Sequence, residues 1–338
     1  MTKLVQSFLA FAVSSSVILA QGWSGAPGKG LKYDGGEAFS LKLGNQLQTH
    51  WVYMHNENAQ DGNSFNVRRA RTSLSGHAYK KNIKYQLTVD AIDNDSNLKD
   101  GYITWTFVDD DNGRISLRMG QAKTLFGLEG TGSSKGLFFV ERSDQARFFS
   151  DARSRGAWVQ GSHMEDKLRW NVAAMNGPVT KATSSGESAS NDDDELSLAV
   201  GVNFDPMGNV TGGKDNQGFK QGDFREGDRD LAGTVGIGYA MENTPGLTGD
   251  TENSTINVHT AWFVEGFQFM GEWFSWTSDV DGAAGSDPEA DGFSIAGNYV
   301  MPKSADSAIQ WGFGARFGQS DFTDSGMPGG DEVTDIAI

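Results

Sequence analysis

Hydrophobic and polar residues alternate along most of the chain. In residues 40–53 the odd positions are mostly Leu, Trp or Tyr, and the even positions up to His50 are Ser, Lys, Gly, Gln or His. Strict alternation of this kind indicates a β-strand, because a helix would need apolar residues three and four positions apart. The same pattern recurs in residues 83–91, 103–107, 115–119, 170–174, 196–204, 231–239, 256–262, 267–273, 293–299 and 311–317. With residues 65–79 and 155–161, it predicts thirteen strands and a fourteenth that begins at Val333.

The segments between the predicted strands carry turn residues. Residues 110–113, 176–178, 205–208 and 243–246 are rich in Asp, Asn, Gly and Pro, which favour tight turns. We find no change of composition that indicates a domain boundary. The sequence therefore predicts an all-β fold with one antiparallel sheet along its whole length.

Whether the apolar side chains point outward or into the interior decides between a membrane barrel and a soluble β fold. Polar positions between the apolar ones are often small or uncharged, as in residues 197–203, which suits a water-filled interior. Trp and Tyr stand near the ends of apolar rows, where membrane barrels carry aromatic girdles. We therefore expect a transmembrane antiparallel up-and-down β-barrel with apolar side chains outside. The alternative is a secreted β-sandwich or solenoid.

The first twenty residues differ from the rest of the chain. Lys3 is their only charged residue, an apolar stretch follows, and Ala20 is a suitable cleavage point. These features predict a secretory signal peptide at residues 1–20 and a barrel domain at residues 21–338. The rest of the sequence contains no run of about 18 apolar residues that would form a transmembrane helix.

Composition excludes several kinds of chemistry. The net charge of -16 argues against a nucleic-acid partner, which would require clustered Lys and Arg. The chain has no Cys, so it has no thiol nucleophile or zinc–thiolate site. Its five His residues show no paired metal-ligand spacing, and no nucleophile motif is present. We accordingly expect no catalytic residues, no metal and no cofactor.

Basic residues on the polar face are the candidate functional site. If the apolar face contacts lipid, Arg69 and Arg71 point into the lumen, because a cation in mid-bilayer would cost about 2–4 kcal/mol. Arg68 has the opposite parity, so it must lie at the rim or on a β-bulge. Further inward-facing cations are Lys42, Lys84, Arg114, Arg118, Arg169 and Arg316. Rings of such groups select anions, whereas the alternative is a solvated basic face without selectivity.

The longest interval between predicted strands is residues 123–155. It contains apolar residues that need burial, namely Leu125, Phe126, Leu137, Phe138, Phe139, Phe148 and Phe149. Its six cations outnumber its four carboxylates; Lys123, Arg142 and Arg147 are candidate pore-lining residues among them. A connection of this length with its own apolar residues is usually functional. We expect it to fold into the lumen as a constriction, the alternative being an external lid.

Five stretches then stand out in their order along the chain: residues 67–71, 98–103, 118–123, 140–143 and 174–177. Together they resemble the phosphate-selective porin O and P family. The first resembles its basic strand, and residues 120–123 resemble the strand end before its inward-folded loop. The resemblance implies a homotrimer of sixteen-stranded outer-membrane barrels that pass small anions such as phosphate.

The chain departs from the family at two points. Leu125 stands where the family typically has a proline, and the sequence ends at Ile338 inside a strand, without the family's terminal aromatic residue. We therefore expect a C-terminal truncation that removes the last two or three of about sixteen strands. Acidic loops are expected to contact lipopolysaccharide through divalent cations. The alternatives are a general or other-anion channel, an outer-membrane barrel enzyme or adhesin, and a secreted β-rich carbohydrate-binding protein.

Overall fold

The computed structural model describes most of the chain after residue 21. The described residues are 22–26, 29–54, 62–92, 97–150, 153–177, 196–207, 210, 218–225, 227, 229–244, 251–280, 288–303, 309–322 and 332–338. The predicted signal peptide lies outside them. The chain divides into two compact units, residues 1–105 and 106–338, and each unit is described separately below.

The first unit is an antiparallel sheet in which neighbours along the chain pair. Its strands are β1 (Trp23–Ala26), β2 (Gly30–Asp34), β3 (Phe39–Met54), β4 (Gly62–Ala78), β5 (Lys80–Asp90) and the first part of β6 (Leu98–Asp110). In the β3–β4 pair the register passes from Gln48 opposite Arg69 to Thr49 opposite Val67. Arg68 is the extra residue of this β-bulge. The parity argument required Arg68 to lie at a rim or on such a bulge.

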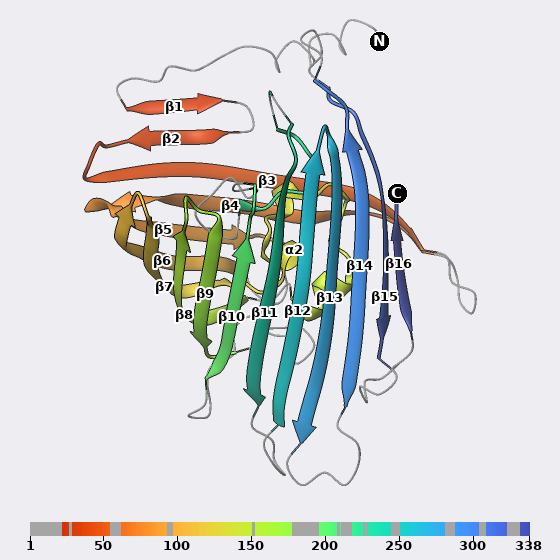
Figure 1. Ribbon diagram of the computed structural model, residues 1–338. Helices are drawn as coiled ribbons and strands as arrows, with labels where there is room; N and C mark the ends of the chain where they lie inside the picture. The colour runs from red at the N-terminus through yellow and green to blue at the C-terminus, as the bar shows by residue number, and fades with distance from the viewer. Residues whose placement is uncertain are drawn as a thin grey trace, which may run out of the picture. The chain divides into compact units, whose positions relative to one another are not determined.

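The second unit also pairs its strands in chain order, and all the pairs are antiparallel. The strands are β7 (Gly113–Lys123), β8 (Arg153–His163), β9 (Leu168–Met175), β10 (Ser197–Phe204), β11 (Ala232–Thr244), β12 (Thr251–Val264), β13 (Phe267–Val280), β14 (Glu289–Val300), β15 (Gly312–Asp321) and β16 (Val333–Ala337). Strands β10 to β16, coloured green to blue, run side by side in Figure 1. In the described part of the chain, no helix is long and apolar enough to cross a bilayer.

All fourteen strands expected from the sequence are present, the fourteenth being β16. Two more strands, β1 and β2, bring the total among the described residues to sixteen. They were not predicted, because stretches of four and five residues are too short to establish a period of two. The all-β fold class is therefore confirmed.

In the second unit, large apolar side chains are exposed and polar side chains are buried, which is the opposite of the arrangement in a soluble protein. In β10, Leu198, Val200 and Val202 are exposed, whereas Ser197 and Asn203 are buried. Strand β12 shows the same alternation, with Ile256 and Val258 exposed and Asn257 and His259 buried, and in β14 the large Phe293 and Ile295 are exposed while Ser294 and Asn298 are buried. This is the arrangement expected for a sheet whose outer face contacts hydrocarbon.

The inner face of β12 to β14 also carries an apolar patch. Phe263, Met270 and Ala296 are buried there, in a cluster with Leu128, Phe139, Phe219 and Ala261. Phe149 stacks on Phe274 of β13 with the ring centroids 5.2 Å apart. Leu128, Phe139 and Phe149 come from the segment between β7 and β8, so this segment packs on the inner face of the sheet.

Candidate functional site

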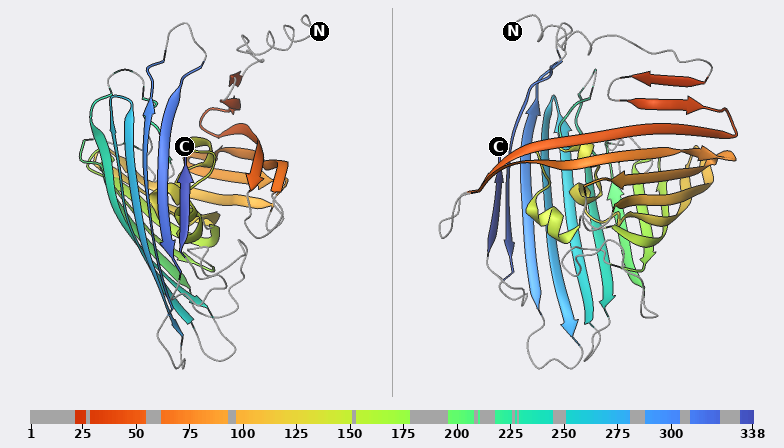
Figure 2. Two further views of the ribbon diagram at one scale, coloured as in Figure 1. Left: turned by 90° about the vertical axis from the view of Figure 1, so that its right-hand side faces the viewer. Right: turned by 180° about the vertical axis from the view of Figure 1, so that it is seen from behind.

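The β7–β8 segment is folded into short helical turns. They are α2 (Leu128–Thr131), the 3-10 turn η2 (Ser134–Gly136) and α3 (Asp144–Phe149). Ser143 caps α3, because its hydroxyl oxygen accepts a hydrogen bond from the Ala146 amide at 3.1 Å. In Figure 2, seen from behind, these helices lie in front of the cyan and blue strands. The segment thus covers the side of the second unit to which the polar rows point.

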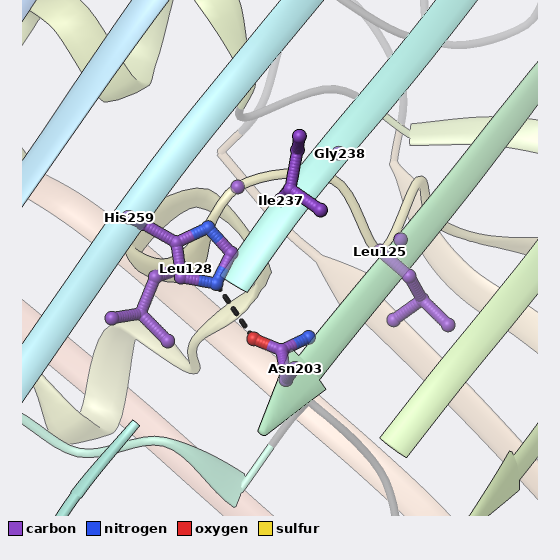
Figure 3. Close-up of a pocket in the computed structure, with 8 residues that line it drawn as sticks. Leu125, Leu128, Asn203, Ile237, Gly238 and His259 are labelled. Carbon is purple, nitrogen blue, oxygen red and sulfur yellow. Dashed lines mark hydrogen bonds between the residues drawn. The ribbon is translucent and has the colours of Figure 1, made fainter. Parts of the chain in front are cut away.

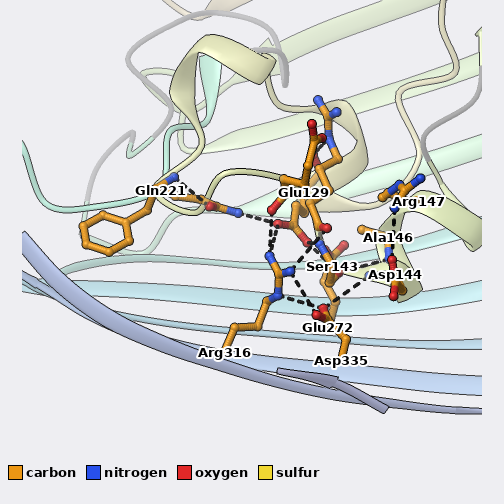
Figure 4. A network of polar contacts seen from close by, with 12 residues as sticks. Glu129, Ser143, Asp144, Ala146, Arg147, Gln221, Glu272, Arg316 and Asp335 are labelled. Atoms are coloured by element: carbon orange, nitrogen blue, oxygen red, sulfur yellow. Dashed lines mark hydrogen bonds and ion pairs between the residues drawn. The ribbon is translucent and has the colours of Figure 1, made fainter. Parts of the chain in front are cut away.

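Two buried carboxylates fix α2 on the sheet. Glu272 of β13 accepts the amide hydrogens of Leu128 and Glu129 at 2.5 and 3.0 Å, so it satisfies the first turn of α2. Glu129 itself accepts the Ser143 hydroxyl at 2.6 Å and the Gln221 side-chain amide at 2.6 Å (Figure 4). Both acidic residues are almost completely buried. This network holds α2 and the start of α3 together.

Arg316 of β15 anchors the other side of the segment. Its guanidinium group donates to Asp335 of β16 at 2.9 and 3.2 Å and to the Glu141 carbonyl at 2.8 Å. It also lies 5.0 Å from the centre of the Phe139 ring and 3.8 Å from the Glu129 carboxylate. The sequence placed Arg316 on the inner face, and the structure shows that it is used there to hold the connection.

Lys123 and Arg142 converge on the end of α2. The Lys123 ammonium donates to the carbonyls of Gly130 and Gly132. The Arg142 guanidinium donates to the carbonyls of Glu129 and Gly132 at 2.9 and 2.6 Å. Cations at the carboxyl end of a helix satisfy its free carbonyls. These two candidate pore-lining residues therefore maintain the fold of the segment.

Other predicted cations of the second unit have different environments. Arg114 and Arg118 lie on the same face of β7; Arg114 is half-buried and donates to Thr106 at 2.9 Å, whereas Arg118 is buried. Arg147 of α3 is half exposed and forms an ion pair with Asp144 at 3.2 Å. Within the described residues, Arg114 forms no ion pair.

Other predicted cations belong to the first unit. Arg69 is 3% exposed and donates to Gln48 at 2.7 Å. Arg71 forms an ion pair with the buried Asp90 at 2.7 Å. Lys42 is exposed on β3. Arg69 and Arg71 thus share the parity on β4 that the alternation predicted, and Asp90 compensates the charge of Arg71.

A narrow pocket lies between the segment and the inner face of β10 to β12. It is lined by Leu125 and Leu128 on one side and by Asn203 and His259 on the other (Figure 3). The His259 ring bonds Asn203 through Nε2 and Asn257 through Nδ1, each at 2.6 Å. The polar side chains of Asn203 and His259 that line the pocket are therefore hydrogen-bonded within the protein. In the described residues, no three His, Asp or Glu side chains are grouped as metal ligands.

Sequence reasoning missed Glu272 and Gln221 as members of the site. Alternation places Glu272 on the inner face of β13, and a single carboxylate between Met270 and Phe274 was the available signal. Gln221 lies outside the strands, so no periodicity pointed to it. The segment's buried apolar residues, by contrast, were anticipated: Leu125, Phe126, Phe139 and Phe149 are all buried.

Comparisons with known proteins agree with this arrangement. A model of the family "Phosphate-selective porin O and P" matches residues 39–306. The anion-selective porin from Comamonas acidovorans is 10% identical with a TM-score of 0.52, covering 83% of this chain and 78% of that chain. The outer-membrane expressed OmpT of Vibrio cholerae is 14% identical with a TM-score of 0.50, covering 89% and 81%. No curated protein sequence matches the chain significantly.

An antiparallel sheet with apolar residues outside, polar residues inside and a connection over its inner face defines the class of outer-membrane porins. The family match extends over most of the chain. The chain belongs to the phosphate-selective porin O and P family. Family and fold indicate a channel rather than an enzyme.

Proposed function

We propose that the protein is a passive outer-membrane channel that favours small anions, phosphate among them. The observation that carries this proposal is the presence of guanidinium groups on the polar face of an inside-out sheet, with Arg114 and Arg118 on β7. Guanidinium groups attract anions and bind phosphate oxygens in a fork. Family membership and the anion-selective porin of the same fold add support.

The nine candidate residues then divide by role. Arg114 and Arg118 are the pore-lining residues of the second unit, and Lys42, Arg68, Arg69 and Arg71 are those of the first unit. Lys123 and Arg142 act indirectly, because their donors hold the carbonyls of the β7–β8 segment. Arg147 adds a local charge that Asp144 partly compensates. Residues 123–155 form the constriction, which their packing on the polar face supports.

We further propose the cellular setting that the family implies. The protein is exported by the signal peptide at residues 1–20 and assembles as a homotrimer. Its outer surface contacts lipopolysaccharide through divalent cations. Glu252 and Asp279 support this contact, since these exposed carboxylates lie directly opposite each other in β12 and β13. Like charges in that position repel unless a cation is bound between them.

Planar-bilayer recording tests the proposed function. The purified protein is expected to form channels whose reversal potential in a KCl gradient indicates preference for chloride, with phosphate reducing the chloride current. Equal permeability to potassium and chloride would identify a general porin instead. Absence of channels, combined with recovery from the soluble periplasmic or secreted fraction, would reject the proposal and favour the carbohydrate-binding alternative.

Chemical cross-linking in mild detergent tests the trimer, and binding to lipopolysaccharide with and without EDTA tests the contact through divalent cations. A single band at monomer mass would exclude the trimer. Binding that EDTA leaves unchanged would exclude the cation bridge. Neither result would alter the channel itself.

A further inference from the structure

A second connection reaches the inner face of the sheet from the opposite end of the strands. The β7–β8 segment begins and ends at Lys123 and Arg153, which are cross-strand partners. The β10–β11 connection starts after Phe204, which pairs with Leu168 beside the short β8–β9 turn. Antiparallel pairing places these two points at opposite strand ends. Yet residues 218–225 of the second connection pack against the first.

The second connection is anchored at the short-turn end. The Gly222 amide donates to the Gln268 side chain at 2.5 Å, and the Gly266 amide donates to the Asp223 carboxylate at 3.0 Å. Burial alone would raise the pKa of Asp223, but hydrogen bonds from Arg225 and Gly266 outweigh it and hold the pKa below its usual value. Asp223 is therefore ionised at neutral pH and keeps its partners.

Gln221 joins this anchored connection to the β7–β8 segment. Its backbone amide donates to the Gly136 carbonyl at 2.7 Å. Its side-chain oxygen accepts the Phe138 amide at 2.9 Å, and its side-chain nitrogen donates to the Glu129 carboxylate at 2.6 Å (Figure 4). One buried residue thus satisfies three groups spread over ten positions of the segment. Phe219 adds an apolar contact in the cluster that contains Leu128.

We propose that residues 218–225 are a second part of the constriction and that Gln221 is its positioning residue. The proposal rests on the proposed channel function and deepens it. Glu129 also accepts from Ser143, so Gln221 completes the set of donors on a buried carboxylate. Without it, that carboxylate keeps fewer donors in a dry environment, which weakens the hold on α2 and α3. The constriction is then held in one position from both ends of the strands.

The variant Gln221→Met tests this role, because methionine keeps the length of the side chain and removes both of its hydrogen bonds. Single-channel recordings should show closures on the order of tenfold more frequent at the same voltage, since bonds to a charged group are lost. Gln319→Met is the matched control, because Gln319 of β15 donates to Glu332, which lies outside this network. It should behave as the wild type. Equal closure frequencies in both variants would overturn the proposal.

A reversible cross-link provides the rescue. A Cβ atom at Gly136 would lie 3.4 Å from the Lys220 Cα, and the chain has no cysteine. In the background of Gln221→Met, the pair Gly136→Cys and Lys220→Cys should restore quiet channels when oxidised and lose them when reduced. Failure to form the disulfide, or oxidation without effect on closures, would count against the proposal. If Gln221→Met does not fold, the pair alone should lower closure frequency on oxidation.

The channel function and the role of Gln221 can fail independently, and each failure gives a different result. A wild-type protein that conducts no ions would reject the channel function itself. A conducting wild type whose closures ignore both Gln221→Met and the cross-link would reject only the role of Gln221.

Discussion

Cations on the inner face differ by the partners that surround them. Arg169 is paired with Asp205 through two hydrogen bonds of 2.6 and 2.8 Å, and both side chains are almost fully buried. Arg316 forms an ion pair with Asp335 in the same way. Arg114 donates to the neutral Thr106, so its positive charge is left to act on ions. Parity alone places all three on one face, but the partners decide which of them can influence selectivity.

Arg114→Gln should therefore reduce anion preference. Removing one charge about 7 Å from the ion path in water raises the energy of a passing anion by roughly 0.6 kcal/mol and lowers that of a cation by the same amount, so the anion-to-cation permeability ratio should fall about sevenfold. Reversal potentials in a KCl gradient measure this ratio. Arg147→Gln, which removes an exposed and paired charge, should have a smaller effect. A larger shift in Arg147→Gln than in Arg114→Gln would contradict this ranking.

Arg169→Met should destabilise the protein, because it leaves the Asp205 carboxylate buried without its guanidinium partner. Breaking a buried ion pair in this way costs roughly 3–5 kcal/mol. Urea unfolding in detergent, followed by the migration shift of the folded form, gives the change in free energy of unfolding. The double variant Arg169→Met with Asp205→Leu should recover most of the loss. If it is no more stable than the single variant, the unpaired charge is not the cause.

At the scale of elements, the β7–β8 segment is bound to the sheet by both charge and apolar contact. Glu272 and Arg316 hold its backbone, while Phe274 stacks on Phe149. These contacts come from β13 and β15, which lie far from the segment in sequence. A connection attached at several points resists displacement by solvent or voltage, as a fixed constriction requires.

Deletion of residues 129–151 should raise single-channel conductance if the segment narrows the ion path. The strand ends remain close together because Lys123 and Arg153 pair directly across β7 and β8. A protein that keeps its heat-modifiable migration but conducts like the wild type would place the segment outside the path. The deletion also uncovers Phe274, so detergent is needed to keep the variant soluble.

Most elements could be predicted from alternation, and the packing of the β7–β8 segment from its apolar and aromatic residues. The strand period also gave Arg69, Arg71 and Arg316 the parity of the polar residues in their strands, and it required Arg68 to lie at the rim or on a bulge, where the register places it. It could not give Gln221, because contacts between two connections depend on how each one folds back over the sheet. The short strands β1 and β2 were missed for lack of length.

At the scale of the whole molecule, the sorting of side chains determines the solvent that the protein requires. The exposed surface of the second unit includes Val200, Ile237, Val258 and Ile295 from four strands. Large continuous apolar surfaces are rare on soluble proteins. In the same unit, polar residues are buried beneath the β7–β8 segment, so the hydrocarbon stabilises the outside while hydrogen bonds stabilise the inside.

Ile237→Arg tests this sorting directly. Ile237 is 54% exposed on β11, between Val202 and Val258 of the neighbouring strands. A charge on the lipid face near the bilayer midplane should destabilise the membrane-folded state by about 2–4 kcal/mol. Unfolding by urea in lipid vesicles, compared with the wild type, measures the difference.

Met207→Arg is the matched control, since Met207 is similarly exposed but lies in the turn after β10. The same charge there should cost little, because it remains in water or near the headgroups. Since both variants add one arginine, a difference in net charge cannot explain unequal stabilities. Equal stability of the two variants in lipid would mean that the outer apolar row of β11 is not in contact with hydrocarbon, and the assignment of the polar face as a channel wall would then lose its basis.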